Sequence, residues 1–84
     1  MLGDFPAAER EYREAVRLRP DWPDALTNLA MALKNQGRPA EAMPYLLDAV
    51  RLDPQNARAS RILAELRAAG VTPATSVSPP STQP

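Results

Sequence analysis

The chain has 84 residues, enough for one small domain but below the size at which a single hydrophobic core is comfortably stable. Ten Lys and Arg residues balance ten Asp and Glu residues, so we expect no nucleic acid partner, because no net positive charge attracts phosphates. The absence of Cys and His excludes disulfides and thiolate metal sites and removes the commonest general base, so we expect no metal, no cofactor and no enzyme.

The first predicted helix covers residues 5–18. Its apolar and small residues recur at steps of three and four, which is typical of an amphipathic helix. Asp4 is a suitable N-cap, and Pro6 fits the first turn, where its missing N–H costs no hydrogen bond. Glu9 and Arg13 form a favourable i,i+4 pair, and we interpret the charged residues of this segment as a solvated face. The apolar stripe consists of Phe5, Ala8, Tyr12, Ala15, Val16 and Leu18.

The second predicted helix runs from about residue 24 to residue 36, after a turn that contains the single Trp of the chain. We expect Trp22 to pack as a lid over the junction of the helices; stacking on a ligand is the alternative. Gly37 follows the helix and supplies the left-handed C-cap conformation, which a Cβ would penalise. The apolar face of this helix consists of Leu26, Leu29, Ala30 and Leu33.

Two further helices are predicted over residues 39–52 and 57–69, the second of them stopped by Gly70. Pro44 lies inside the first of these patterns, where it removes one backbone hydrogen bond and presses on the carbonyl of Ala40, so we expect a kink or a delayed helix start. The inward residues of the third helix are Ala42, Leu46, Ala49 and Val50. Those of the fourth are Ile62, Leu63 and Leu66.

We therefore predict one helical domain over residues 1–70 and a disordered tail over residues 71–84. The tail is rich in Pro, Ser and Thr, contains no charged residue and has only scattered Val as large apolar side chains. A segment of this composition cannot bury enough apolar surface to offset the entropy that it would lose on ordering.

The sequence repeats itself at a spacing of 34 residues around the central stretch 23–54. A fixed period of this size is typical of a helical repeat array rather than of a globular enzyme. Across the first junction, the residues Gly3, Ala8, Ala15, Val16, Arg17, Leu18 and Pro20 return as Gly37, Ala42, Ala49, Val50, Arg51, Leu52 and Pro54. Across the second junction, Ala25, Leu29 and Ala30 return as Ala59, Leu63 and Ala64.

This pattern resembles the tetratricopeptide repeat family, whose signature reads W-x₂-L-G-x₂-Y, then A-x₃-F, then P. One full repeat, residues 23–56, is flanked by two half repeats. In the last half repeat, Ser60 and Arg67 stand where the family has bulky residues. The signature positions of the full repeat are filled, in order, by Leu26, Leu29, Ala30, Leu33, Ala42, Leu46 and Pro54.

The resemblance implies an all-α fold, a right-handed α-solenoid of about four helices in antiparallel pairs, in which neighbouring pairs cover each other's apolar faces. It also implies a function, because members of this family are scaffolds that bind peptide segments of other proteins. They do so in a concave groove lined by the first helix of each pair. The residues that we expect in this groove are Asp24, Thr27, Asn28, Met31, Asn35, Arg58, Arg61, Ile62 and Glu65.

Two kinds of side chain in this set suit a peptide ligand. Asn28 can donate to and accept from an extended backbone at once, and Arg58 and Arg61 can bind a carboxylate. The alternative is that all of these are ordinary solvated helix residues. Some relatives clamp the C-terminal carboxylate of chaperones, and Asn28 and Arg58 are in register with two positions of that clamp. Ile62 replaces a basic residue that the clamp requires, so we do not carry this activity over.

We therefore expect a protein-interaction module that is a fragment or short member of a scaffold, since the chain opens in mid-repeat. The alternative is a self-assembling element that continues the solenoid head-to-tail, or forms a swapped dimer, through end helices that lack cover. No apolar run approaches the ~18 residues of a transmembrane helix, and the N-terminus lacks the regions of a signal peptide, so we expect a cytoplasmic protein without a membrane partner. The residues expected to self-associate are Phe5, Ala8, Tyr12, Ile62 and Leu66.

Overall fold

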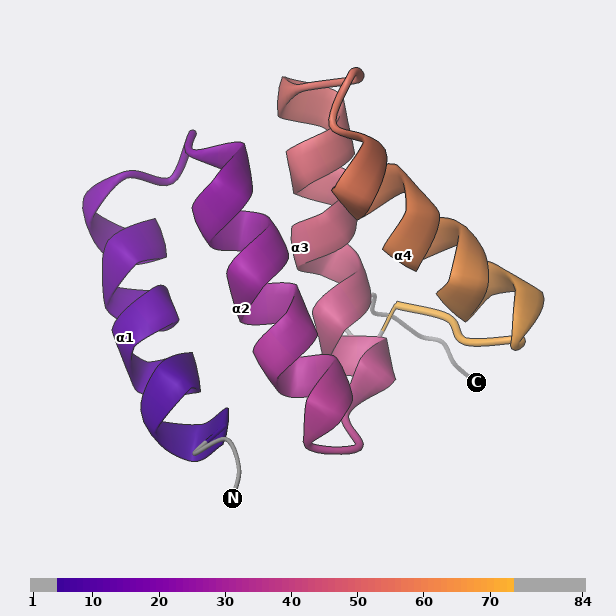
Figure 1. Cartoon of the computed structure of the whole chain (residues 1–84), viewed down its shortest axis with the longest axis horizontal. Coiled ribbons are helices and arrows are strands. Elements are labelled where there is room, and N and C mark those ends of the chain that lie inside the picture. The colour runs from indigo at the N-terminus through magenta and orange to yellow at the C-terminus, as the bar shows by residue number, and fades with distance from the viewer. Residues whose placement is uncertain (1–4, 74–84) are drawn as a thin grey trace, which may run out of the picture.

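The computed structural model describes residues 5–73, which form four α-helices joined by short turns. Successive helices run antiparallel and lie side by side in the order of the sequence (Figure 1). The predicted all-α fold of helix pairs is therefore confirmed. The helices are α1 (Phe5–Leu18), α2 (Pro23–Asn35), α3 (Pro39–Leu52) and α4 (Ala57–Ala68).

The bounds of α1 and α3 coincide with the predicted ranges. The start and the end of α2 each lie one residue earlier than predicted. The last helix, α4, ends one residue before its predicted end. The proposed cap Asp4 lies outside the described residues. No helix in the part of the chain that the structure describes has the length and apolar character needed to cross a bilayer.

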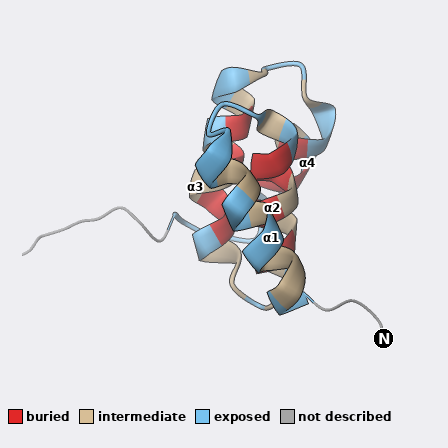
Figure 2. Ribbon diagram, turned by 90° about the vertical axis from the view of Figure 1, so that its left-hand side faces the viewer, coloured by how far each residue is buried: buried red, intermediate tan, exposed pale blue. Residues whose placement is uncertain are grey.

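The core lies between α2 and α3, which share the most extensive contact of the fold. Buried side chains gather along the inner faces of α2, α3 and α4, whereas α1 contributes no fully buried residue (Figure 2). Small residues allow close approach of the helix backbones, since Ala30 on α2 and Ala42 and Ala49 on α3 are fully buried. The remaining members of this core cluster are Leu26, Leu29, Leu33, Met43, Leu46, Ala59, Ile62, Leu63 and Leu66.

The C-terminal ends of α2 and α4 share one hydrogen-bonding pattern. Gly37 has the expected left-handed backbone, with φ of 76°, and Gly70 has φ of 82°. After α2, the N–H of Arg38 donates to the carbonyl of Leu33 at 3.0 Å, which together with the bond from Gly37 to the carbonyl of Lys34 forms a Schellman motif. These bonds satisfy carbonyls in the last turn of each helix.

The corresponding bond after α4 corrects the predicted start of the tail. The N–H of Val71 donates to the carbonyl of Leu66 at 3.0 Å, and the half-buried Val71 side chain packs against the core. Val71 therefore belongs to the folded domain, because it provides the apolar contact that accompanies this type of helix end. Residues 74–84 of the predicted tail lie outside the described residues.

The expected delay of the third helix by Pro44 is wrong. The helix begins at Pro39, whose ring suits the first helical position, and it continues through Pro44 to Leu52. Pro44 has no N–H to donate to the carbonyl of Ala40, so one backbone bond is missing. The buried residues Met43 and Leu46 on either side hold this turn against the core, so tertiary packing maintains the helix despite the missing bond.

Candidate functional site

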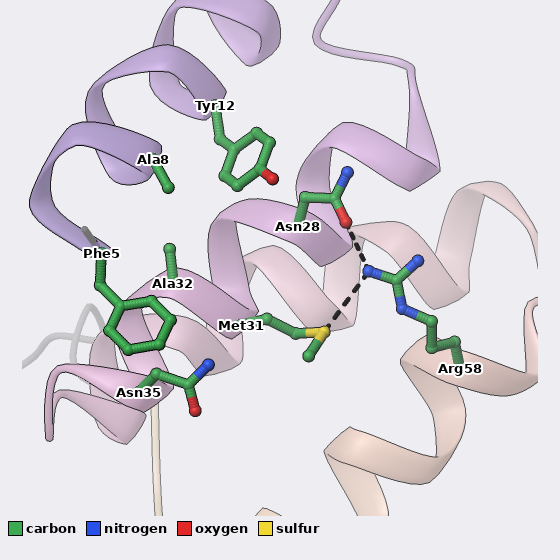
Figure 3. Close-up of a pocket in the computed structure, with 8 residues that line it drawn as sticks. All are labelled: Phe5, Ala8, Tyr12, Asn28, Met31, Ala32, Asn35 and Arg58. Carbon is green, nitrogen blue, oxygen red and sulfur yellow. Dashed lines mark hydrogen bonds between the residues drawn. The ribbon is translucent and has the colours of Figure 1, made fainter. Parts of the chain in front are cut away.

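A cavity of about 220 Å³ lies between α1 and α2, and the side chain of Arg58 on α4 reaches it (Figure 3). Apolar side chains of α1 and α2 form most of its wall, and two amides and one guanidinium provide its polar groups. We call this cavity the α1–α2 pocket. Its lining residues are Phe5, Ala8, Tyr12, Asn28, Met31, Ala32, Asn35 and Arg58.

Helix periodicity explains why these residues meet. Phe5, Ala8 and Tyr12 follow one another at steps of three and four, so they share one face of α1. Asn28 and Asn35 are separated by seven residues and therefore share one face of α2. The pocket is thus a product of two helix faces that lie opposite each other, closed at one edge by the first turn of α4.

Arg58 connects α4 to the pocket wall. One of its terminal nitrogens, Nη2, donates to Oδ1 of Asn28, and the same nitrogen lies 3.4 Å from Sδ of Met31 (Figure 3). Arg58 is exposed and forms no ion pair with a carboxylate of the described residues. The guanidinium has five N–H groups, so several of them are available to a carboxylate supplied by a ligand.

Four of the predicted groove residues line the pocket, and three others are exposed beside it or beyond it. The four that line it are Asn28, Met31, Asn35 and Arg58. The three exposed residues outside it are Asp24 on α2 and Arg61 and Glu65 on α4.

Two predicted groove residues are not available at the surface. Thr27 is 0% exposed, and its hydroxyl donates to the carbonyl of Pro23 at 2.9 Å. This bond within the helix satisfies the hydroxyl, which allows a polar side chain to be buried. Ile62 is 6% exposed and belongs to the core. Both positions border the groove in the sequence pattern, but the neighbouring helices cover them.

The residues expected to self-associate also fall into two groups, those that line the pocket and those that are buried in the core. Phe5, Ala8 and Tyr12 line the pocket, and Phe5 is 37% exposed. Ile62 and Leu66 were expected on an uncovered face of the last helix, but both are only 6% exposed. The reason is that α4 turns this face towards the core between α2 and α3.

Ala32 lines the pocket but was not among the predicted site residues. It follows Asn28 by four residues, so the same helix face that included Asn28 would have identified it.

The expected role of Trp22 as a packed lid is only partly met, because its side chain is 39% exposed. The guanidinium of Arg19 lies 4.9 Å from the centroid of the Trp22 ring and covers it by a cation–π contact.

A hydrogen-bonded cluster around Glu9 joins α1 to the turn between α2 and α3. One carboxylate oxygen accepts from Nε of Arg13 at 2.8 Å, and the other accepts from Gln36 and Arg38, each at 2.9 Å. These bonds, from Gln36 first and Arg13 next, together with the charges of both Arg residues, lower the pKa of Glu9 from 4.5 to about 2. Arg13 also donates to the hydroxyl of Tyr45 on α3 at 3.0 Å.

Within residues 5–73, no three His, Cys, Asp or Glu residues gather closely enough to hold a metal ion.

Antiparallel helices with a spacing of 34 residues and a lined pocket on one face define an α-helical repeat protein. The family described as tetratricopeptide repeat matches residues 2–57 and 27–75, and the chain belongs to this family. Domains of this family generally mediate protein–protein interactions.

Two curated relatives share this part of their sequence with the chain. "TPR repeat-containing thioredoxin TTL4" of Arabidopsis thaliana is 42% identical over 64 residues, which are 76% of this chain and 9% of that protein. "Protein O-mannosyl-transferase Tmtc3" of Drosophila melanogaster is 32% identical over 62 residues, which are 74% of this chain and 7% of that protein. The chain thus spans less than a tenth of either relative. No solved structure matches it significantly.

Proposed function

We propose that this module binds a peptide segment of a partner protein in the α1–α2 pocket. The observation that carries the proposal is a cavity lined by both apolar and polar side chains, among them Arg58, an exposed guanidinium without a carboxylate partner among the described residues. The cavity, at about 220 Å³, is smaller than the ~300–1,000 Å³ that is usual for small-molecule pockets. A side chain of a protein ligand suits this volume better than a cofactor does.

The polar groups of the pocket suit a peptide. Oδ1 of Asn28 accepts from Arg58, which leaves the amide nitrogen of Asn28 to donate to a carbonyl of the ligand. An apolar ligand side chain would contact Met31 and Tyr12, while an acidic side chain would bind Arg58. The preferred ligand is therefore an apolar residue with an acidic neighbour.

In this proposal the module is a non-catalytic, cytoplasmic part of a scaffold or adaptor. The pairing of its acidic side chains supports the non-catalytic role alone, because Glu9, Glu14 and Glu41 each form an ion pair with an Arg residue. Hydrogen bonds from Arg17 and Arg38 lower the pKa of Glu14 and Glu41, so these carboxylates are weaker bases than usual.

A peptide array tests the proposal. Peptides that combine an apolar and an acidic residue should bind saturably, and Arg58→Ala should weaken the best of them about tenfold, because a hydrogen bond to a charged group contributes ~1.5–3 kcal/mol. Arg61→Ala is the matched control, since Arg61 is exposed on the same helix but does not line the pocket. Equal losses from both substitutions, or uniform failure of the array, would contradict the proposal.

A further inference from the structure

We propose that Met31 is an oxidation site, at which a hydroperoxide converts the thioether to a sulfoxide whose oxygen accepts a hydrogen bond from Arg58. The oxidised pocket then binds its ligand more weakly. The chemistry at Met31 stands on its own, whereas its effect on a ligand rests on the function proposed above. The groups involved lie on two helices, Met31 on α2 and Arg58 on α4.

The two methionines of the described residues lie in different surroundings. Met31 lines the pocket and is half-buried, so a molecule as small as hydrogen peroxide can reach its sulfur through the cavity. Met43 is 2% exposed and belongs to the core cluster. Protein cores are close-packed and contain few voids as large as a water molecule. A peroxide should therefore react with Met31 and leave Met43 unmodified.

A hydrogen-bond donor already lies beside the sulfur of Met31. Nη2 of Arg58 donates to Oδ1 of Asn28 and lies 3.4 Å from Sδ of Met31 (Figure 3). A thioether is only a weak acceptor, so this contact contributes little in the reduced protein. A sulfoxide oxygen is a much stronger acceptor, and the flexible side chain of methionine lets it turn towards the guanidinium. Oxidation thus replaces a weak contact by a charge-assisted hydrogen bond.

The oxidation step needs one reactant, a hydroperoxide such as hydrogen peroxide. Sδ attacks one peroxide oxygen, the O–O bond breaks and the S–O bond forms. The departing hydroxide takes the proton of the transferred oxygen and leaves as water. The sulfur loses two electrons and the peroxide gains two. Methionine sulfoxide reductases reverse the change, so the modification can be removed.

The sulfoxide changes the pocket in two ways. Its oxygen competes with a ligand carboxylate for the guanidinium of Arg58. It also places a polar group in the wall that an apolar side chain of the ligand would contact, and covering this group costs free energy. A ligand with an apolar residue and an acidic neighbour should therefore lose affinity at both positions.

Oxidation of Met31 should leave the fold intact. Its side chain packs against the core cluster but borders the cavity, so Arg58 or water can donate to the new oxygen. Oxidation of Met43 would instead place an oxygen among fully buried aliphatic side chains, where no such donor is available at the surface. Met31 is therefore the methionine whose modification is compatible with a folded module.

Peroxide treatment of the full chain tests the selectivity. Samples taken over time are digested with trypsin, which separates Met31 from Met43 because Lys34 lies between them. In the folded protein Met31 should oxidise at least tenfold faster than Met43, and in concentrated urea the two rates should become equal. Tandem mass spectrometry distinguishes oxygen on Met31 from oxygen on Trp22, which lies in the same tryptic peptide.

Nuclear magnetic resonance of the arginine side chains tests the new hydrogen bond. Oxidation should shift the Nε–Hε signal of Arg58, whereas the signal of Arg61, exposed on the same helix, should stay in place. Met31→Leu keeps an apolar side chain that peroxide does not modify, so this variant should show no shift at Arg58. Thermal unfolding of the wild type before and after oxidation should differ by less than about 4 °C.

The effect on a ligand is measured with the best peptide of the array. The oxidised protein should bind it about tenfold more weakly, and treatment with methionine sulfoxide reductases should restore the affinity. Met31→Gln places an amide oxygen near the position of the sulfoxide oxygen and should weaken binding to a similar degree. Met31→Leu should bind equally well before and after peroxide treatment.

The outcomes separate this inference from the proposed function. Equal oxidation rates of Met31 and Met43 in the folded protein, or selective oxidation of Met31 without a shift at Arg58, would overturn the inference. Unchanged peptide affinity after selective oxidation would also overturn it and leave the proposed function intact. If no peptide binds the reduced protein, the proposed function is wrong, while the oxidation rates and the Arg58 signal still decide the chemistry at Met31.

Discussion

At the scale of single residues, Glu9 is the carboxylate that holds α1 in place. Its side chain is only 13% exposed, and its partners Gln36 and Arg38 are 27 and 29 residues away in the chain. Because α1 has no fully buried residue, such polar contacts are a larger part of its attachment than they are for α2 or α3. The same geometry keeps Glu9 ionised well below the usual pH for a carboxyl group.

This geometry predicts how acid affects stability. The pKa of Glu9 is about 2 in the folded protein and has its ordinary value of 4.5 in the unfolded chain, so the stabilisation is fully present above pH 4.5 and is lost as the pH falls towards 2. Glu9→Gln should lower the free energy of unfolding by about 1–2 kcal/mol at neutral pH, after allowance for solvent screening. Urea denaturation of both proteins between pH 2 and pH 7 should show this gap closing as the pH falls.

Glu11→Gln is the control for this experiment. Glu11 is exposed on the same helix and forms no ion pair with a described residue, so its replacement should change stability little. A constant difference between wild type and Glu9→Gln across the whole pH range would show that Glu9 does not act through its charge.

At the scale of secondary-structure elements, α3 contains two prolines in different roles. Pro39 occupies the first position of the helix, where the chain has no hydrogen bond to lose. Pro44 lies within the helix and is half-buried, and it leaves the carbonyl of Ala40 without its usual helical donor. The helix persists because Leu46 and Ala49 are packed against α2, as both are fully buried members of the core.

Pro44→Ala should therefore stabilise the protein by about 1–2 kcal/mol, because it restores one backbone bond and removes the ring, less the entropy that the unfolded chain gains. Pro39→Ala should change stability by less than about 0.5 kcal/mol and serves as the matched control. Chemical denaturation monitored by far-ultraviolet circular dichroism measures both. If Pro44→Ala gives no gain, the helix has already adjusted to the proline without cost.

At the scale of the whole molecule, the two end helices present different outer surfaces. The free face of α1 carries Phe5, Ala8 and Tyr12, whereas the equivalent of the α2 apolar face on α4 carries Ser60 and Arg67. A polar outer face on a terminal helix limits the stacking of further repeats. The surfaces of the two ends are therefore not complementary, and we expect no head-to-tail assembly of wild-type chains through α4.

This expectation can be tested by restoring the missing stripe. The double substitution Ser60→Leu and Arg67→Leu copies Leu26 and Leu33 of α2, so α4 of one molecule should then pack on α1 of another. Sedimentation velocity should show association that increases with concentration for this variant. Adding Tyr12→Glu to it should reverse the association, because a carboxylate would then face the new apolar stripe.

A double substitution of exposed residues on two other helices, Arg17→Leu on α1 and Arg51→Leu on α3, adds comparable apolar surface and controls for non-specific aggregation. If that control associates to the same degree, the association is non-specific and does not depend on the α4 face. Association of the wild-type chain through α4, detected by its loss in Arg61→Glu, would likewise show that the polar surface does not prevent stacking.

The sequence by itself determined the four helices and their order, because apolar residues at steps of three and four, together with Gly37, Gly70 and the prolines, mark where each helix begins and ends. It also determined the family, since the fixed 34-residue spacing can be recognised in the sequence without any knowledge of contacts between the helices. Seven pocket residues were named from the sequence, but for two different sites: four as groove residues implied by the family resemblance and three as a self-associating face of α1.

Only the tertiary structure decided which residues at the edges of those faces are covered. Periodicity gives the direction of a side chain around its own helix but not the neighbour that lies there, so Thr27 and Ile62 were assigned to a groove although both are buried. The bond between Arg58 and Asn28, 30 residues apart, and the cluster around Glu9 depend on the same relative placement of helices. Such contacts between distant segments arise from packing, which the spacing of residues within one helix does not encode.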